Sequence, residues 1–176
     1  LGTQRAKERD LKLLKAQGYS NKQALDRLEI RIDTMSGFKS LMEKIKEVYL
    51  DSTVFITASL NTNSVGRKAR DILNAVDKQL IEGYTSTLTF DEVVFIVRKL
   101  AGFEKSLAVG DAFLKIQYLR FIDVTYGLVL LAQELIRKYK IKPRDAIHAA
   151  CASDKGIKFL ISGKSFLILV NVFSIT

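Results

Sequence analysis

Cysteine and histidine are nearly absent from this chain of 176 residues, which contains one of each. A single cysteine cannot form an intramolecular disulfide or a zinc site built from thiolates, so a reducing, intracellular compartment is the default expectation. A single histidine leaves little from which to build a serine-type or cysteine-type catalytic triad. We therefore interpret Cys151 as a small packed side chain, and His148 as a packing residue or one at the edge of a substrate site.

Long apolar runs are also missing. No run reaches the roughly 18 residues of a membrane span. The longest candidate, residues 159–175, is interrupted by Ser162, Gly163, Lys164 and Asn171, and it predicts two short strands. The first seven residues contain no apolar signal core, so we expect neither secretion nor a membrane partner.

The composition fits a compact domain with an appendage. Hydrophobic residues make up 48% of the chain, which is enough to bury a substantial core. The net charge of +9 is compatible with a phosphate-bearing partner, although many basic proteins have no nucleic-acid role. Charge alone therefore does not decide the function.

The first 47 residues predict a helical appendage, and residues 48–176 predict a separate domain. Helices are expected at residues 5–17, 21–33 and 38–47, from capping residues and from glycines at their ends. A packing or dimerising appendage is the first interpretation, because turn-separated helices are commonplace. The alternatives are a DNA-binding helix-turn-helix, for which a basic second helix is weak support, and a helical arm that wraps the domain that follows.

Strand-like and helix-like runs alternate after residue 48. The strands are expected at residues 46–51, 84–88, 119–124 and 158–162, and the helices at residues 64–81, 90–100, 105–117, 126–138 and 144–155. Such alternation predicts an α/β fold with three layers, in which helices cover both faces of a central parallel sheet.

Three acids occupy unusual positions in this pattern. Asp51 interrupts an apolar, partly β-branched run where a parallel strand would end, and Asp145 follows Pro143 in the first turn of an Ala-rich helix. Glu92 follows a Thr/Ser-rich strand. Each has a structural alternative: Asp145 complements the helix dipole, and Glu92 could complete a capping box with Thr89 as the N-cap.

These acids are predicted to converge. In open α/β sheets, ligands bind beyond the carboxyl ends of the strands. Asp51 is expected to end one strand there, and Glu92 and Asp145 are expected on the helices that flank it. Three carboxylates at one edge would repel one another, and a divalent cation would relieve that repulsion.

Taken together, these segments resemble the PIN-domain ribonucleases, especially the toxins of prokaryotic VapBC toxin-antitoxin pairs. The resemblance covers roughly residues 47–176. It rests on the segments Tyr49-Leu50-Asp51-Ser52, Thr85-Ser86 to Glu92-Val93-Val94, Pro143-Arg144-Asp145-Ala146-Ile147-His148-Ala149-Ala150 and Gly156 to Ser162.

The resemblance implies a metal-dependent endoribonuclease that uses Mg²⁺ or Mn²⁺. Asp51, Glu92 and Asp145 would be its catalytic residues and metal ligands, one or two of them binding directly and the others through water. Thr53 and Ser86 could orient Asp51 or contact phosphate, but ordinary strand-end and turn hydrogen bonding explains them at least as well. Arg144 could contact RNA phosphates, and a solvated arginine at the start of the helix is an equal alternative. The implied partners are an RNA substrate, an antitoxin protein and a second copy in a homodimer.

One part of the family pattern is absent. Members usually carry further acids after the last core strand, whereas this chain has no Asp or Glu from Lys155 to Thr176 and places Lys164 in that loop. This difference favours one alternative, a non-catalytic RNA-binding PIN module in which the Lys164 ammonium takes the position of the cation. A second alternative is an interaction protein controlled by its N-terminal helices.

Overall fold

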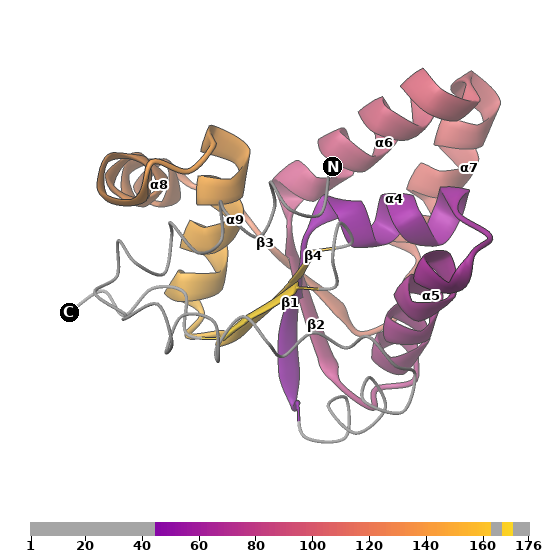
Figure 1. Cartoon of the computed structure of the whole chain (residues 1–176), viewed down its shortest axis with the longest axis horizontal. Coiled ribbons are helices and arrows are strands. Elements are labelled where there is room, and N and C mark those ends of the chain that lie inside the picture. Colours follow the sequence, from indigo (N-terminus) through magenta and orange to yellow (C-terminus); the bar gives the residue numbers. More distant parts are fainter. Residues whose placement is uncertain (1–44, 163–166, 171–176) are drawn as a thin grey trace.

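A five-stranded sheet in the order β3-β2-β1-β4-β5 forms the centre of the molecule in this computed structural model (Figure 1). The strands are β1 Glu47–Leu50, β2 Glu82–Ser86, β3 Leu119–Ile122, β4 Phe159–Ser162 and β5 Leu167–Val170. β1 pairs in parallel with β2 and β4, β2 pairs in parallel with β3, and β5 runs antiparallel to β4 at the edge. The predicted parallel sheet is confirmed, and the predicted pair of short strands near the C-terminus corresponds to β4 and β5.

The structure describes residues 45–162 and 167–170. The predicted N-terminal helices, apart from the last residues of the third, lie outside these residues. So does the loop around Lys164. Residues 46 and 47, which both the third helix and the first strand were predicted to include, lead into and begin β1.

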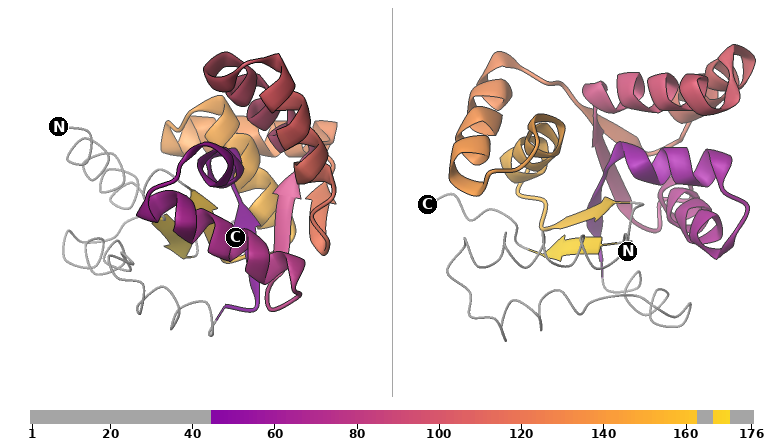
Figure 2. Two further views of the ribbon diagram at one scale, coloured as in Figure 1. Left: turned by 90° about the vertical axis from the view of Figure 1, so that its right-hand side faces the viewer. Right: turned by 45° about the horizontal axis from the view of Figure 1, so that its top comes forward.

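Helices cover both faces of the sheet, as predicted (Figures 1 and 2). They are α4 Ser52–Leu60, α5 Ser64–Asp77, α6 Thr87–Ala101, α7 Phe103–Leu114, α8 Tyr126–Tyr139 and α9 Pro143–Asp154. Side chains alternate along β1, so Val48 and Leu50 pack with α4 to α7 whereas Tyr49 packs with α8 and α9. Among the described residues, no helix is long and apolar enough to cross a membrane.

Helix α4 was not predicted. Its sequence, STVFITASL, is β-branched and apolar, which resembles a strand. The helix forms because Asp51 caps it, with a side-chain oxygen that accepts a hydrogen bond from the Thr53 backbone N–H. Asp51 therefore both ends β1 and begins α4.

The predicted N-cap of α6 is wrong. The helix begins at Thr87 instead of Phe90, and Ser86 is its N-cap. The Thr89 hydroxyl accepts a hydrogen bond from the Ser86 backbone N–H at 3.4 Å, so Thr89 fills the capping-box position that was assigned to Glu92. Glu92 lies one turn further into the helix, where its carboxylate is not needed for capping.

Candidate metal centre

The Asp51 carboxylate is held in one orientation at the carboxyl end of β1. Its Oδ1 accepts hydrogen bonds from the Ser52 hydroxyl at 3.0 Å and the Thr53 backbone N–H at 3.3 Å, and its Oδ2 accepts one from the Thr53 hydroxyl at 3.1 Å. The Thr53 hydroxyl also lies 3.1 Å from that of Ser162 at the end of β4. Three donors thus fix the carboxylate before any ligand arrives.

Glu92 is a buried acid in the interior of α6, with 4% of its surface exposed. A carboxylate at such a depth needs partners that replace water. Its Oε2 lies 2.8 Å from Nε2 of His148, and its Oε1 lies 3.5 Å from Nε of the half-exposed Arg144. α9 therefore supplies both partners of a carboxylate from α6.

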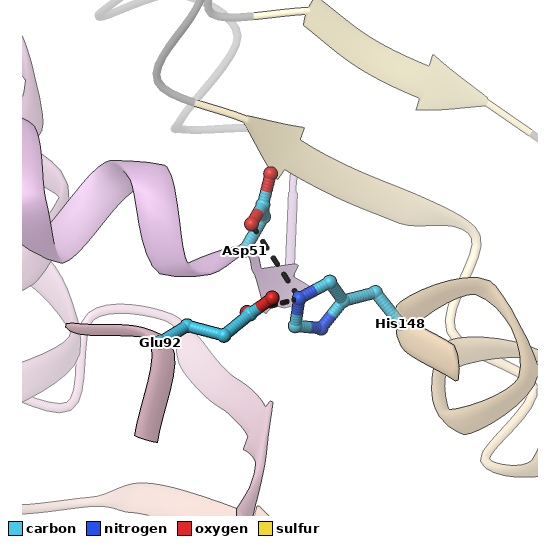
Figure 3. A group of neighbouring side chains, drawn as sticks. All are labelled: Asp51, Glu92 and His148. Atoms are coloured by element: carbon cyan, nitrogen blue, oxygen red, sulfur yellow. Dashed lines mark hydrogen bonds and ion pairs between the residues drawn. The ribbon is translucent and has the colours of Figure 1, made fainter. Parts of the chain in front are cut away.

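His148 joins the two acids (Figure 3). It lies buried on α9, and its Nε2 is 2.8 Å from Glu92 Oε2 and 3.6 Å from Asp51 Oδ1. Its other ring nitrogen, Nδ1, lies 2.8 Å from the buried hydroxyl of Tyr49. One imidazole thus connects the carboxylates to a strand residue beneath α9.

The surrounding charges govern the ionisation of His148. Burial of the ring would lower its pKa, but the hydrogen bond to Glu92 and the negative charges of Asp51, Glu92 and Asp145 outweigh burial, so the pKa is raised above its ordinary value. In its protonated form the ring brings positive charge to the two carboxylates, as a bound cation would. Burial also raises the pKa of the Tyr49 hydroxyl, which therefore remains protonated.

The donor set fits a divalent cation. A carboxylate oxygen from Asp51, one from Glu92 and a ring nitrogen of His148 all lie within 4.8 Å of one another. Ligands of an octahedral ion at about 2.1 Å are separated by about 3 to 4 Å, so small side-chain shifts would place all three around one ion. Carboxylate oxygens suit Mg²⁺ and Mn²⁺.

Asp145 is placed differently from the other two acids. It is exposed in the first turn of α9, and it is not among the three residues of the 4.8 Å group. Its negative charge nevertheless raises the pKa of His148, one helical turn further along. This placement suits an acid that acts on the site across water.

The three supporting residues predicted from sequence fall at different places. Thr53 contacts Asp51 directly through its hydroxyl. Ser86 is buried and bonded to Thr89, so it belongs to the cap of α6. Arg144 contacts Glu92 and keeps more than half of its side chain exposed.

His148 was predicted at most to lie at the edge of a substrate site, and Tyr49 was not predicted to belong to the site. The available signal was the spacing of Asp145 and His148, three residues apart, which places them on one face of a helix. The alternation along β1 likewise separates Tyr49 from its apolar neighbours. Neither pattern indicates that Tyr49 and His148 meet.

Comparisons with known proteins agree with this fold. The PIN domain model matches residues 48–168, whereas no curated protein matches the sequence. VapC20 of Mycobacterium tuberculosis, a sarcin-ricin loop cleaving toxin, is similar in structure with a TM-score of 0.57 at 16% identity, over 65% of this chain and 88% of that chain. VapBC2 of Rickettsia felis, bound to a DNA fragment from its promoter, is similar in structure with a TM-score of 0.53 at 18% identity, over 66% of this chain and 86% of that chain. These two likenesses concern the fold, but the family match spans more than half of the sequence, and the chain therefore belongs to the PIN domain family.

Proposed function

We propose that this protein is a metal-dependent endoribonuclease of the toxin type, which hydrolyses phosphodiester bonds in RNA. The observation that carries the proposal is the convergence of Asp51 and Glu92 on one imidazole at the carboxyl end of the sheet in a PIN domain. Acids that share a small space are typical of sites that bind a cation.

Each acid has a proposed role. Asp51 and Glu92 hold Mg²⁺ or Mn²⁺ directly, and Asp145 acts through water. When bound, the cation supplies a polarised water for in-line attack and charge stabilisation on the phosphate. The hydrogen bonds from Ser52 and Thr53 keep the Asp51 carboxylate in place. Arg144, half-exposed beside Glu92, is positioned to contact an RNA phosphate.

Cleavage of RNA by the purified protein tests the proposal. We expect hydrolysis that requires Mg²⁺ or Mn²⁺, stops in a chelator, and is lost in Asp51→Asn and Asp145→Asn while the circular dichroism spectrum is retained. Asp154→Asn, at the other end of α9, is the matched control and should cleave normally. Cleavage that persists in chelator or in Asp51→Asn contradicts the proposal.

A non-catalytic PIN module for RNA binding or protein interaction is the second candidate. It is favoured by the partners that Glu92 already has, because His148 and Arg144 satisfy this carboxylate without a cation. On this alternative the pure protein binds RNA but cleaves none, and added Mn²⁺ leaves its thermal unfolding unchanged.

The proposed partners are an RNA, an antitoxin protein and a second copy of the chain. The toxin-antitoxin assembly of the Rickettsia felis neighbour supports the antitoxin, and exposed apolar side chains such as Phe95, Leu100 and Phe103 support protein contacts. Light scattering of the purified chain tests the homodimer: a monomer mass at micromolar concentration contradicts it.

A further inference from the structure

We propose that His148 is itself a ligand of the cation, and that its nitrogen makes the site prefer Mn²⁺ and Co²⁺ over Mg²⁺. The inference rests on the proposed metal-dependent function and assigns a third ligand at that site. The carboxylates of Asp51 and Glu92 are its other two direct ligands.

The position of Nε2 is the first argument. This atom faces both carboxylates at once, 2.8 Å from Glu92 and 3.6 Å from Asp51. An ion that joins Glu92 Oε2 to Asp51 Oδ1 therefore enters the space that Nε2 borders. The ring is buried, so it cannot turn out to solvent and leave the ion to oxygen ligands alone.

Tyr49 provides the second argument, because it can fix the ring in the form that binds metal. To bind a metal, Nε2 must give up the proton that it donates to Glu92, which leaves the ring proton on Nδ1 and requires an acceptor there. The Tyr49 hydroxyl oxygen lies 2.8 Å from Nδ1, buried between the sheet and α9. Metal-binding histidines commonly have such an outer acceptor, which holds the ring in orientation.

The selectivity follows from the chemistry of the three donors. Mg²⁺ takes oxygen ligands and gives up its waters reluctantly, whereas an imidazole nitrogen favours transition metals. A site of two carboxylates and one imidazole should therefore bind Co²⁺ more tightly than Mn²⁺, and Mn²⁺ more tightly than Mg²⁺. A site of carboxylates alone would distinguish these ions less.

The direct test uses the fact that His148 is the only histidine of the chain. The untagged, full-length protein is prepared with ¹⁵N-labelled histidine, loaded with Mn²⁺, and studied by pulsed electron paramagnetic resonance. We expect a ¹⁵N coupling characteristic of a directly bound imidazole. Bound Mn²⁺ without this coupling overturns the inference and leaves the proposed ribonuclease intact, whereas failure to bind Mn²⁺ at all overturns both.

A second measurement compares metal affinities by calorimetry in two variants. Tyr49→Phe removes the acceptor of Nδ1 and should weaken Mn²⁺ binding by about 10-fold, the usual cost of losing such a partner. His148→Leu removes the nitrogen and should weaken Mn²⁺ more than Tyr49→Phe does, and more than it weakens Mg²⁺. Tyr84→Phe, on the adjacent strand with its hydroxyl bonded to Glu82, is the matched control. An unchanged ratio of Mn²⁺ to Mg²⁺ affinity in folded His148→Leu overturns the inference.

Discussion

The two faces of the sheet are packed in different ways. The face covered by α4 to α7 is filled with branched aliphatic and aromatic side chains, and the Phe55 and Phe113 rings meet edge to face with centroids 4.7 Å apart. On the other face, α9 buries mostly small residues such as Ala149 and Ala150, and the polar pair Tyr49 and His148 is enclosed there. Small residues bring α9 close to the sheet, and this closeness allows a strand hydroxyl to reach a helix imidazole.

The candidate site lies where these two faces meet, at the carboxyl ends of the strands. Glu92 comes from α6 on the first face and His148 from α9 on the second, while Asp51 ends the central strand between them. We infer that the first face supplies stability and that the second also sets the geometry of the site.

Among changes to the elements on the two faces of the sheet, loss of the Glu92 charge should reduce activity most. Glu92→Gln keeps the shape of the side chain but removes the charge that pairs with Arg144 and His148. We expect RNA cleavage to fall by about 100-fold or more, at least the cost of losing a residue that supports a metal ligand. Asp91→Asn, on the exposed side of the same helix, is the control. Equal activities of the two variants would contradict the proposed role of Glu92 as a metal ligand.

Loss of a large side chain from the first face should reduce stability without affecting the site. Phe113 is 3% exposed and packs edge-on against Phe55 and Phe121. Phe113→Ala should lower the free energy of unfolding in urea by about 3 to 5 kcal/mol, because it leaves a cavity. The Mn²⁺ affinity of the folded variant should not change, and a weakened affinity would show that the first face also shapes the site.

Overpacking of the second face should lower both the stability of the protein and its affinity for Mn²⁺. Ala150 is fully buried on α9, two residues after His148. Ala150→Leu should lower the free energy of unfolding by about 1 to 3 kcal/mol and push α9 away from the sheet. Mn²⁺ affinity, measured by calorimetry, should then fall although no ligand has changed. Retained affinity in a destabilised variant would refute the proposed role of this close packing.

The smallest effect concerns Cys151, which belongs to the second face but not to the site. Burial raises the pKa of its thiol to about 11, so almost no reactive thiolate is present at neutral pH. We expect iodoacetamide to label this single cysteine slowly in the native protein and rapidly in urea, as mass spectrometry would detect. Equal rates would mean that α9 opens readily.

Much of the fold could be predicted from sequence, because apolar runs and the breaks between them indicate the strands and helices that alternate around a parallel sheet. The exceptions are instructive. α4 has the composition of a strand and forms because the Asp51 carboxylate caps it, and α6 begins three residues before its predicted start because Ser86 is the cap. A single polar side chain decided each boundary.

The site was less accessible to sequence analysis. Strand-end and helix-start positions indicated Asp51, Glu92 and Asp145, but the roles of these acids stay predictions. The contacts of His148 with Glu92 and Tyr49 join residues 56 and 99 positions apart. Such pairings depend on how α9 packs on the sheet, and no local sequence pattern predicts that packing.

Diffraction from crystals soaked in Mn²⁺, recorded where the ion scatters anomalously, tests most directly whether a cation binds between Asp51, Glu92 and His148. We expect an anomalous peak within ligand distance of the Asp51 and Glu92 carboxylates, with Nε2 of His148 beside it. Crystals that show no peak there at saturating Mn²⁺, with Glu92 still bonded to His148 and Arg144, would contradict it.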